Sequence, residues 1–475
     1  MTAAPAASRT VPPSGVPSAR QLRSRLRRAR RRHHPPSLGD LLTDIYMAVL
    51  FTAMYGWAFV SNVREYLHSP SADPADPAER YWLAGAALLA VAGLGWQGLR
   101  ALGPVLVTPA TQAWAVSAPV DRRAWLLPRA GLLIGLAAGA GALLGAALGA
   151  VGTALVDRAD LRLAALAGAA CGAAGVGLSI VAQGSLPGRR WPRLLGTGAT
   201  VAGALGAVTV VVAHFTGLGL VRPSVPVALL VVVVALPLAV LTGALALRAL
   251  PRVDRASLTT GAQFANAAAT AAVLLDPSLL FGLVESRRWR GVGRVRSRRF
   301  LAGRRWWVLL QAEARRLRRH PSAPTAWVAL VLLQYAVAVA VPVAAGTAQV
   351  VGAFLAAGRL AGGLRAVSRS PGLRRVLGGD DTAVRLVHLV WPAVGAALWW
   401  VVTLPVGGAQ PGWLTVVLVL GVVAGAYRAA TKPPMSYDTA MVDTPFGMIP
   451  VGLLSQLLRG WDVVAVVVVA RLLLT

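Results

Sequence analysis

Residues 129–156 read RAGLLIGLAAGAGALLGAALGAVGTALV, a run that carries no charged side chain after Arg129. An α-helix needs about 20 apolar residues to cross the hydrocarbon core of a bilayer, and this run is long enough. Similar runs recur along the whole chain of 475 residues, which is 56% hydrophobic and only 14% charged. A soluble protein with so few charges could not cover its surface. The sequence therefore predicts an all-α, polytopic transmembrane helical bundle.

Ten to twelve spans are expected. The clearest are 41–62, 82–103, 129–156, 162–186, 194–217, 226–249, 325–345, 347–366, 384–405 and 412–429. The apolar segment 436–475 is interrupted by Pro450, Arg459 and Asp462. It is compatible with two short spans, with one span and a surface helix, or with a re-entrant hairpin.

The net charge of +29 comes mainly from arginines that lie between the apolar runs. Residues 20–32 hold eight arginines and residues 287–305 hold nine, whereas residues 63–80 are acidic. Because cytoplasmic loops carry the excess of positive charge, this pattern places the N-terminus in the cytoplasm. Anionic lipid at the cytoplasmic face accounts for the arginines, so we do not expect nucleic acid as a partner.

Glycines recur every four residues on two neighbouring spans. Gly141, Gly145 and Gly149 share one face of the first span, and Gly168 and Gly172 repeat the spacing on the next. In lipid, small residues let two helix backbones approach closely. We interpret this pattern as helix packing rather than as a ligand site.

Two halves of the chain share short motifs in the same order. Arg-Arg-His-His-Pro at 31–35 precedes the first span, and Arg-Arg-His-Pro at 318–321 precedes the span at 325. Gly-Leu-Arg-Ala occurs at 98–101 and again at 363–366. This order indicates two fused, diverged half-proteins.

The repeat predicts four parts of the chain. They are a disordered tail at 1–19, a first transmembrane half at 20–250, a basic cytoplasmic linker at 251–306 and a second transmembrane half at 307–475. Each half begins with a basic amphipathic helix, and the second is the clearer one. Trp307, Leu310, Ala314 and Leu317 share one face of it.

Motifs for enzyme chemistry are not found. The sequence has no Walker-type phosphate loop, no nucleophile elbow and no metal-ligand spacing among its six histidines and single cysteine. We therefore expect no catalytic residue, no cofactor and no metal, and the lone Cys171 is interpreted as packing. The predicted spans are almost free of ionisable residues, since Asp44, Arg359 and His214 lie near span ends. This disfavours a proton-coupled carrier.

The most distinctive polar segment, read from Gly103, is GPVLVTPATQAWAVSAPVDRRAWLLPR. Asp121, Arg122 and Arg123 follow Pro119, which suits the start of a short helix with an acid in its first turn. The corresponding segment of the second half, PGLRRVLGGDDTAVR at 371–385, has no Pro-Val-Asp-Arg-Arg. Its charged candidates are Arg374, Arg375, Asp380 and Asp381.

The first segment resembles the cytoplasmic stretch between the second and third spans of type-2 ABC exporter permeases, where a Pro-Val-x-Arg-Arg-like sequence precedes the third span. The basic helix before each half resembles their elbow helix. The resemblance implies a permease subunit in a bacterial plasma membrane, with a separate ATP-binding cassette ATPase docking on 104–128 and 367–383. Arg122 and Arg123 would then bond to acids on that ATPase, and Asp121 would pair with a basic group.

Two other functions stay open from the sequence. One is a membrane scaffold or assembly protein without a transport cycle, whose section 250–324 recruits partners or lipid. The other is an ion-coupled carrier. The spans offer few polar groups for recognising a substrate, which favours an apolar or amphipathic cargo.

Overall fold

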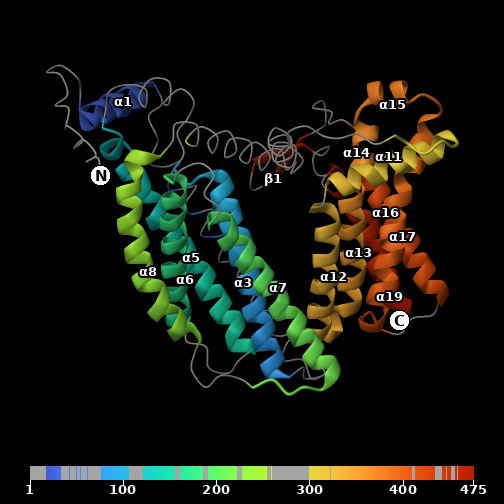
Figure 1. Cartoon of the computed structure of the whole chain (residues 1–475), viewed down its shortest axis with the longest axis horizontal. Helices are drawn as coiled ribbons and strands as arrows, with labels where there is room; N and C mark the ends of the chain where they lie inside the picture. The colour runs from blue at the N-terminus through green and yellow to red at the C-terminus, as the bar shows by residue number, and fades with distance from the viewer. Residues whose placement is uncertain are drawn as a thin grey trace, which may run out of the picture. The chain divides into compact units, whose positions relative to one another are not determined.

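The structure is a computed structural model of the chain (Figure 1). It describes residues 18–33, 76–105, 121–155, 161–185, 191–221, 227–253, 299–320, 322–408, 412–433, 441–444, 447–450, 455–456 and 458–474, with single residues at 42, 46, 50, 54, 61 and 258. The predicted tail up to residue 17, nearly all of the predicted span 41–62, Pro119 and most of the linker 251–306 lie outside the described residues.

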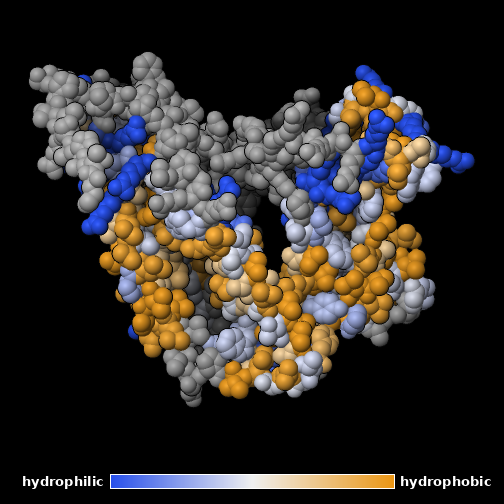
Figure 2. Space-filling model, in the orientation of Figure 1, coloured by the Kyte–Doolittle hydropathy of each residue, from blue (hydrophilic) through white to orange (hydrophobic). Residues whose placement is uncertain are grey.

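Nine helices in the described part of the chain are long and apolar enough to cross a membrane. They are α3 (Pro77–Leu102), α5 (Arg122–Leu155), α6 (Leu161–Gln183), α7 (Trp191–Thr216), α8 (Val227–Ala249), α12 (Ser322–Ala340), α13 (Ala345–Leu360) with the 3-10 turn η3 (Pro342–Ala344), α16 (Asp381–Thr403) and α17 (Gly412–Ala430). Large apolar side chains cover their flanks, as Figure 2 shows. The chain is therefore a multi-pass membrane protein built as a helical bundle, as the sequence predicts.

The chain divides into two compact units. The first unit comprises 1–69, 88–202 and 222–267, and the second comprises 70–87, 203–221 and 268–475. The second unit thus includes the first turns of α3 and the last turns of α7 beside all helices from α11 (Arg305–Arg319) onward.

In the first unit, α5 and α6 pack through the predicted glycine faces. A Cβ built on Gly141 would lie 2.2 Å from the carbonyl oxygen of Gly168, and one on Gly145 would lie 2.2 Å from that of Ala164. Only a hydrogen at these positions lets the two backbones touch. The packing interpretation of this glycine pattern is confirmed.

The start of α5 corrects one prediction. The sequence suggested a short helix after Pro119 and a separate span from residue 129, but a single helix runs from Arg122 to Leu155 through Pro128. Proline lacks the N–H that would bond the carbonyl four residues earlier, which here belongs to Ala124. The basic helix α1 (Ala19–His33) supplies a substitute, because Arg23 Nη1 donates to the Ala124 oxygen at 2.6 Å.

In the second unit, the core lies between α13, α16, α17 and α19 (Trp461–Leu474). Trp399 of α16 is fully buried against Gly352 of α13, where a Cβ would lie 2.5 Å from the indole ring. The predicted span 347–366 is not one helix. It ends at Leu360, and α14 (Gly362–Arg369) and α15 (Pro371–Leu377) follow, so the second Gly-Leu-Arg-Ala motif lies in α14 instead of closing a span.

The described part of the C-terminal tail contains a strand pair that the sequence does not predict. Two strands, β1 (Met441–Thr444) and β2 (Gly447–Pro450), pair antiparallel with Val442 opposite Ile449. Pro450 ends β2, where its missing N–H costs the ladder little. The helix α19 then has 14 residues, fewer than the roughly 20 that a span needs.

Candidate partner-docking site

The described end of the first docking segment, from Asp121 onward, forms the N-terminal turn of α5, and residues 106–120 lie outside the described residues. Asp121 caps this turn, since its Oδ1 accepts the backbone N–H of Arg123 at 2.9 Å. The Arg123 side chain is exposed and that of Arg122 is half-buried. Arg23 of α1 bonds to the backbone just beyond them, donating to Ala124 O and, at 3.4 Å, to Trp125 O. The basic helix α1 is thereby attached to the segment that carries the two arginines.

The second docking segment, 367–383, begins in the last turn of α14, includes α15 and ends in the first turn of α16. Arg374 is held inside it: its Nε lies 2.7 Å from Asp381 Oδ2, and its Nη1 donates to Val367 O and Ser368 O at 2.9 and 2.8 Å. Asp380 caps α16 by accepting the Ala383 N–H at 3.0 Å. Three of the four predicted side chains therefore fix the shape of this segment.

The outer surface of α15 is apolar and basic. Val376 is 85% exposed, Leu373 is also exposed, and Arg375 lies beside them with its side chain exposed. Gly378 ends the helix with a φ of 71°, a conformation that glycine adopts without strain. Exposed apolar side chains beside a cation are typical of a surface that another protein covers.

The surface helix α11 holds the junction between α13 and α14. Glu313 is buried, and its carboxylate accepts from Arg316 Nε at 2.9 Å and from the N–H of Gly363 at 3.3 Å. Arg316 Nη2 in turn lies 3.5 Å from the carbonyl oxygen of Leu360. The acid thus faces the positive end of α14 and the arginine faces the negative end of α13.

The same surface helix also reaches α15. Arg305, at the first position of α11, donates through Nη2 to Leu377 O at 2.8 Å and also to Gly378 O. Trp391 of α16 donates its indole N–H to Leu310 O at 3.2 Å. Figure 1 shows α11, α14 and α15 at one end of the second unit, away from the C-terminus. A displacement of α15 would therefore be passed to α11 and α16.

The comparison with known proteins gives a family. The profile of one family, described as a family of unknown function, matches residues 73–440, which is more than half of the chain. The chain belongs to DUF6297. The DUF6297 match includes both docking segments and all of α11, whereas α1 and α19 lie outside it. No curated protein and no solved structure matches the chain.

Sequence reasoning did not find the groups that hold the docking segments in this DUF6297 protein. Arg23, Arg305 and Glu313 each contact residues far away in sequence, up to 102 positions for Arg23 and Trp125. The sequence contains one indication that Glu313 has a structural role, since it is the single acidic residue between residues 287 and 319. Within the described residues, no group of three or more His, Cys, Asp and Glu side chains could hold a metal ion.

Proposed function

We propose that the chain is the membrane-spanning permease subunit of an ATP-driven, ABC exporter-like transport complex whose ATPase is a separate chain. It resides in a bacterial plasma membrane with its N-terminus, its basic helices and both docking segments in the cytoplasm. The orientation follows from the arginine distribution. The arginines of α1 and α11 also attract anionic lipid at that face.

The observation that carries the proposal is the attachment of α15. Its outer surface exposes Val376, Leu373 and Arg375, while Arg305 ties its C-terminal end to α11 and the Arg374–Asp381 ion pair ties it to α16. A helix that only connected two spans would not need charged contacts to two neighbouring helices. These contacts suit a segment on which an ATPase docks, because a movement of α15 when the ATPase closes on ATP would be passed to both α11 and the span α16.

Two exposed arginines and the half-buried Arg122 would supply the polar part of the docking contact. Arg122, Arg123 and Arg375 would donate charge-assisted hydrogen bonds to acids on the ATPase, each worth roughly 1.5–3 kcal/mol. Burial of Val376 would add about 1.5–3 kcal/mol. Arg374, Asp380 and Asp381 would position the segment from within the chain.

The test is co-purification from native membranes in mild detergent. The tagged chain should retain an ATPase that mass spectrometry identifies by a Gly-x-x-x-x-Gly-Lys-[Ser/Thr] loop. Arg375→Glu, and separately the pair Arg122→Glu and Arg123→Glu, should reduce its recovery at least tenfold. Arg318→Glu is the matched control, since this arginine is exposed on α11 and lies outside both docking segments in the sequence.

The outcome also separates the alternatives. A scaffold or an ion-coupled carrier would co-purify with no Walker-type ATPase, or its recovery would not depend on these arginines. Unchanged recovery in both reversed variants would contradict the proposal.

A further inference from the structure

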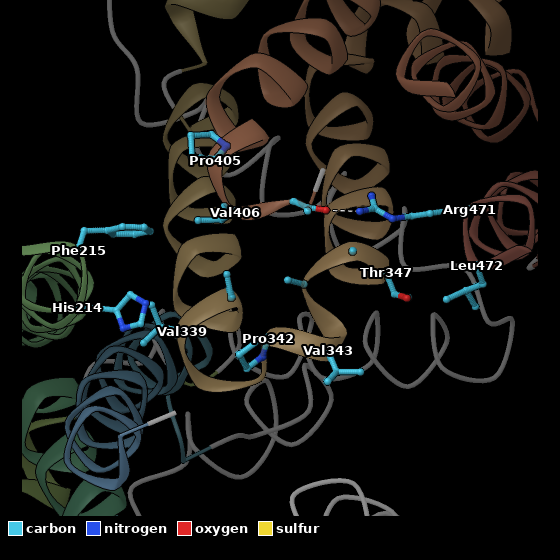
Figure 3. Close-up of a pocket in the computed structure, with 15 residues that line it drawn as sticks. His214, Phe215, Val339, Pro342, Val343, Thr347, Pro405, Val406, Arg471 and Leu472 are labelled. Carbon is cyan, nitrogen blue, oxygen red and sulfur yellow. Dashed lines mark hydrogen bonds between the residues drawn. The ribbon is translucent and has the colours of Figure 1, made fainter. Parts of the chain in front are cut away.

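The second unit contains a cavity at the end away from α11, α14 and α15. Its volume is 460 Å³, within the range of small-molecule sites. The turn η3, the start of α13, the 3-10 turn η4 (Leu404–Val406) with the glycines that follow it, and the end of α19 form its wall. Figure 3 shows Arg471 entering from one side and Phe215 and His214 on the other. All of these residues belong to the second unit.

Arg471 is the unusual member of this wall. It lies in the last turn of an apolar helix and is only 5% exposed, although burying a guanidinium is costly unless it is hydrogen-bonded. Its Nη1 donates to Gln349 Oε1 at 2.8 Å, and its Nη2 donates to Gly407 O. Gln349 is itself buried and donates to Thr403 Oγ1 at 2.9 Å. Arg471 thus joins α19 to α13 and to the turn after η4.

Two glycines make room for these side chains. A Cβ on Gly346 would lie 2.8 Å from Arg471 Nε, and a Cβ on Gly407 would lie 2.3 Å from the Gln349 amide. The backbone is therefore shaped around the guanidinium, and its fixed position is a property of the fold. A charge built into an apolar helix at this cost is a candidate binding group.

The remaining wall combines apolar side chains with polar groups. Val339, Val343 and Leu472 line it, with the Thr347 hydroxyl as a neutral polar group. Among the described residues that line the cavity, Arg471 and His214 are the titratable ones, and no carboxylate is among them. His214 Nδ1 lies 2.9 Å from Oε2 of Glu79, an acid outside the lining. Arg471 is therefore the permanently charged residue of the described lining.

We infer that this cavity binds an anionic amphiphile, a molecule with a carboxylate or phosphate head and a short hydrocarbon body. The head would lie against the guanidinium of Arg471, whose positive charge attracts both anions. The body would pack against Val339, Val343 and Leu472. The apolar part of the wall gives an anion with a hydrocarbon body contacts that a fully polar anion lacks, and the cation at the wall disfavours an uncharged hydrocarbon.

The experiment uses the full chain in nanodiscs of phosphatidylcholine, without ATP or an ATPase. Equilibrium dialysis measures binding of radiolabelled octanoate after the signal of empty nanodiscs is subtracted. Octyl phosphate, octan-1-ol, acetate and inorganic phosphate then serve as competitors. We expect saturable binding of one octanoate per chain, displaced by octyl phosphate. Octan-1-ol and the two small anions should displace it at least tenfold less well.

Two variants locate the binding. Arg471→Gln removes the cation but also removes a contact between three elements, so it is paired with Thr347→Trp, which fills the cavity and leaves Arg471 in place. Each should weaken octanoate binding at least tenfold. Val401→Trp is the matched control, because Val401 is an exposed residue of α16 outside the cavity lining.

Several results would overturn the inference. One is the lack of saturable octanoate binding in the unmodified chain. Another is octanoate binding that is unchanged in Thr347→Trp. The third is displacement of octanoate by octan-1-ol or inorganic phosphate as effectively as by octyl phosphate. The experiment measures ligand binding to the cavity and not transport, so a negative result would not contradict the proposed permease function. The interpretation of the bound molecule as transported cargo does rest on the proposed function.

Discussion

A methyl group at Gly363 should loosen the surface helix α11. The Cβ of an alanine would lie 2.0 Å from Glu313 Oε2 and 2.4 Å from its Cδ, so the buried carboxylate must move by about 1 Å or more to restore ordinary contact. This movement breaks its hydrogen bond with the Gly363 N–H. The first copy of the same motif provides the control, because a Cβ on Gly98 meets nothing within 4 Å.

The size of the effect follows from two opposing contributions. Loss of a buried hydrogen bond to a charged group costs about 1.5–3 kcal/mol. The better helix propensity of alanine recovers up to about 1 kcal/mol. The net destabilisation of the α11–α14 contact is therefore about 1–2 kcal/mol, which corresponds to a factor of roughly 5–30 in the local opening equilibrium.

Hydrogen–deuterium exchange of the chain in nanodiscs measures this opening directly. Gly363→Ala should accelerate exchange of peptides from 305–319 by that factor, whereas Gly98→Ala should leave its own helix unchanged or slightly more protected. In a Glu313→Ala background, Gly363→Ala should add little, since the clash is gone. Equal exchange in Gly363→Ala and the unmodified chain would refute the coupling of α11 to α14.

Two further predictions concern the first unit. Gly141→Leu should separate α5 from α6 and abolish the monodisperse peak of the protein in gel filtration. Gly139→Leu is the control and should keep this peak, because a Cβ on Gly139 meets nothing within 4 Å. Arg23→Gln should accelerate hydrogen exchange in the first turns of α5 severalfold, since the Ala124 carbonyl loses its donor. Pro128→Ala should suppress that effect by restoring a backbone N–H to the same carbonyl.

The sequence was sufficient to predict most of the bundle. Hydrophobic runs determine where spans lie in lipid, and the described spans agree with the predicted ranges within a few residues, apart from the early start of α5 and the break after Leu360. The glycine spacing at Gly141 and Gly168 also predicted a real contact. The spans depend on hydrophobicity within one stretch of sequence, and the glycine contact depends on a spacing that repeats along one helix, so both can be recognised in a single sequence.

Several contacts that hold the candidate sites together are not local. Glu313 and Gly363 are 50 residues apart, and Arg471 and Gln349 are 122 residues apart. No periodicity connects them, so a single sequence cannot pair them. The sequence leaves the tail at 436–475 unassigned, and for that reason the buried Arg471 of α19 was not predicted. The strands β1 and β2 were overlooked for the same reason.

Site-specific photocrosslinking tests the proposed docking most directly. A benzoylphenylalanine placed at Val376, which is 85% exposed on α15, should crosslink on illumination of intact cells to an ATPase carrying a Walker-type phosphate loop. The same group at Val401, which is exposed on the apolar flank of α16, should not crosslink to it. Capture of the ATPase from position 376 alone is the predicted result. Failure to capture such an ATPase from position 376, or equal capture from both positions, would contradict the proposal that this chain is the permease of an ATP-driven complex.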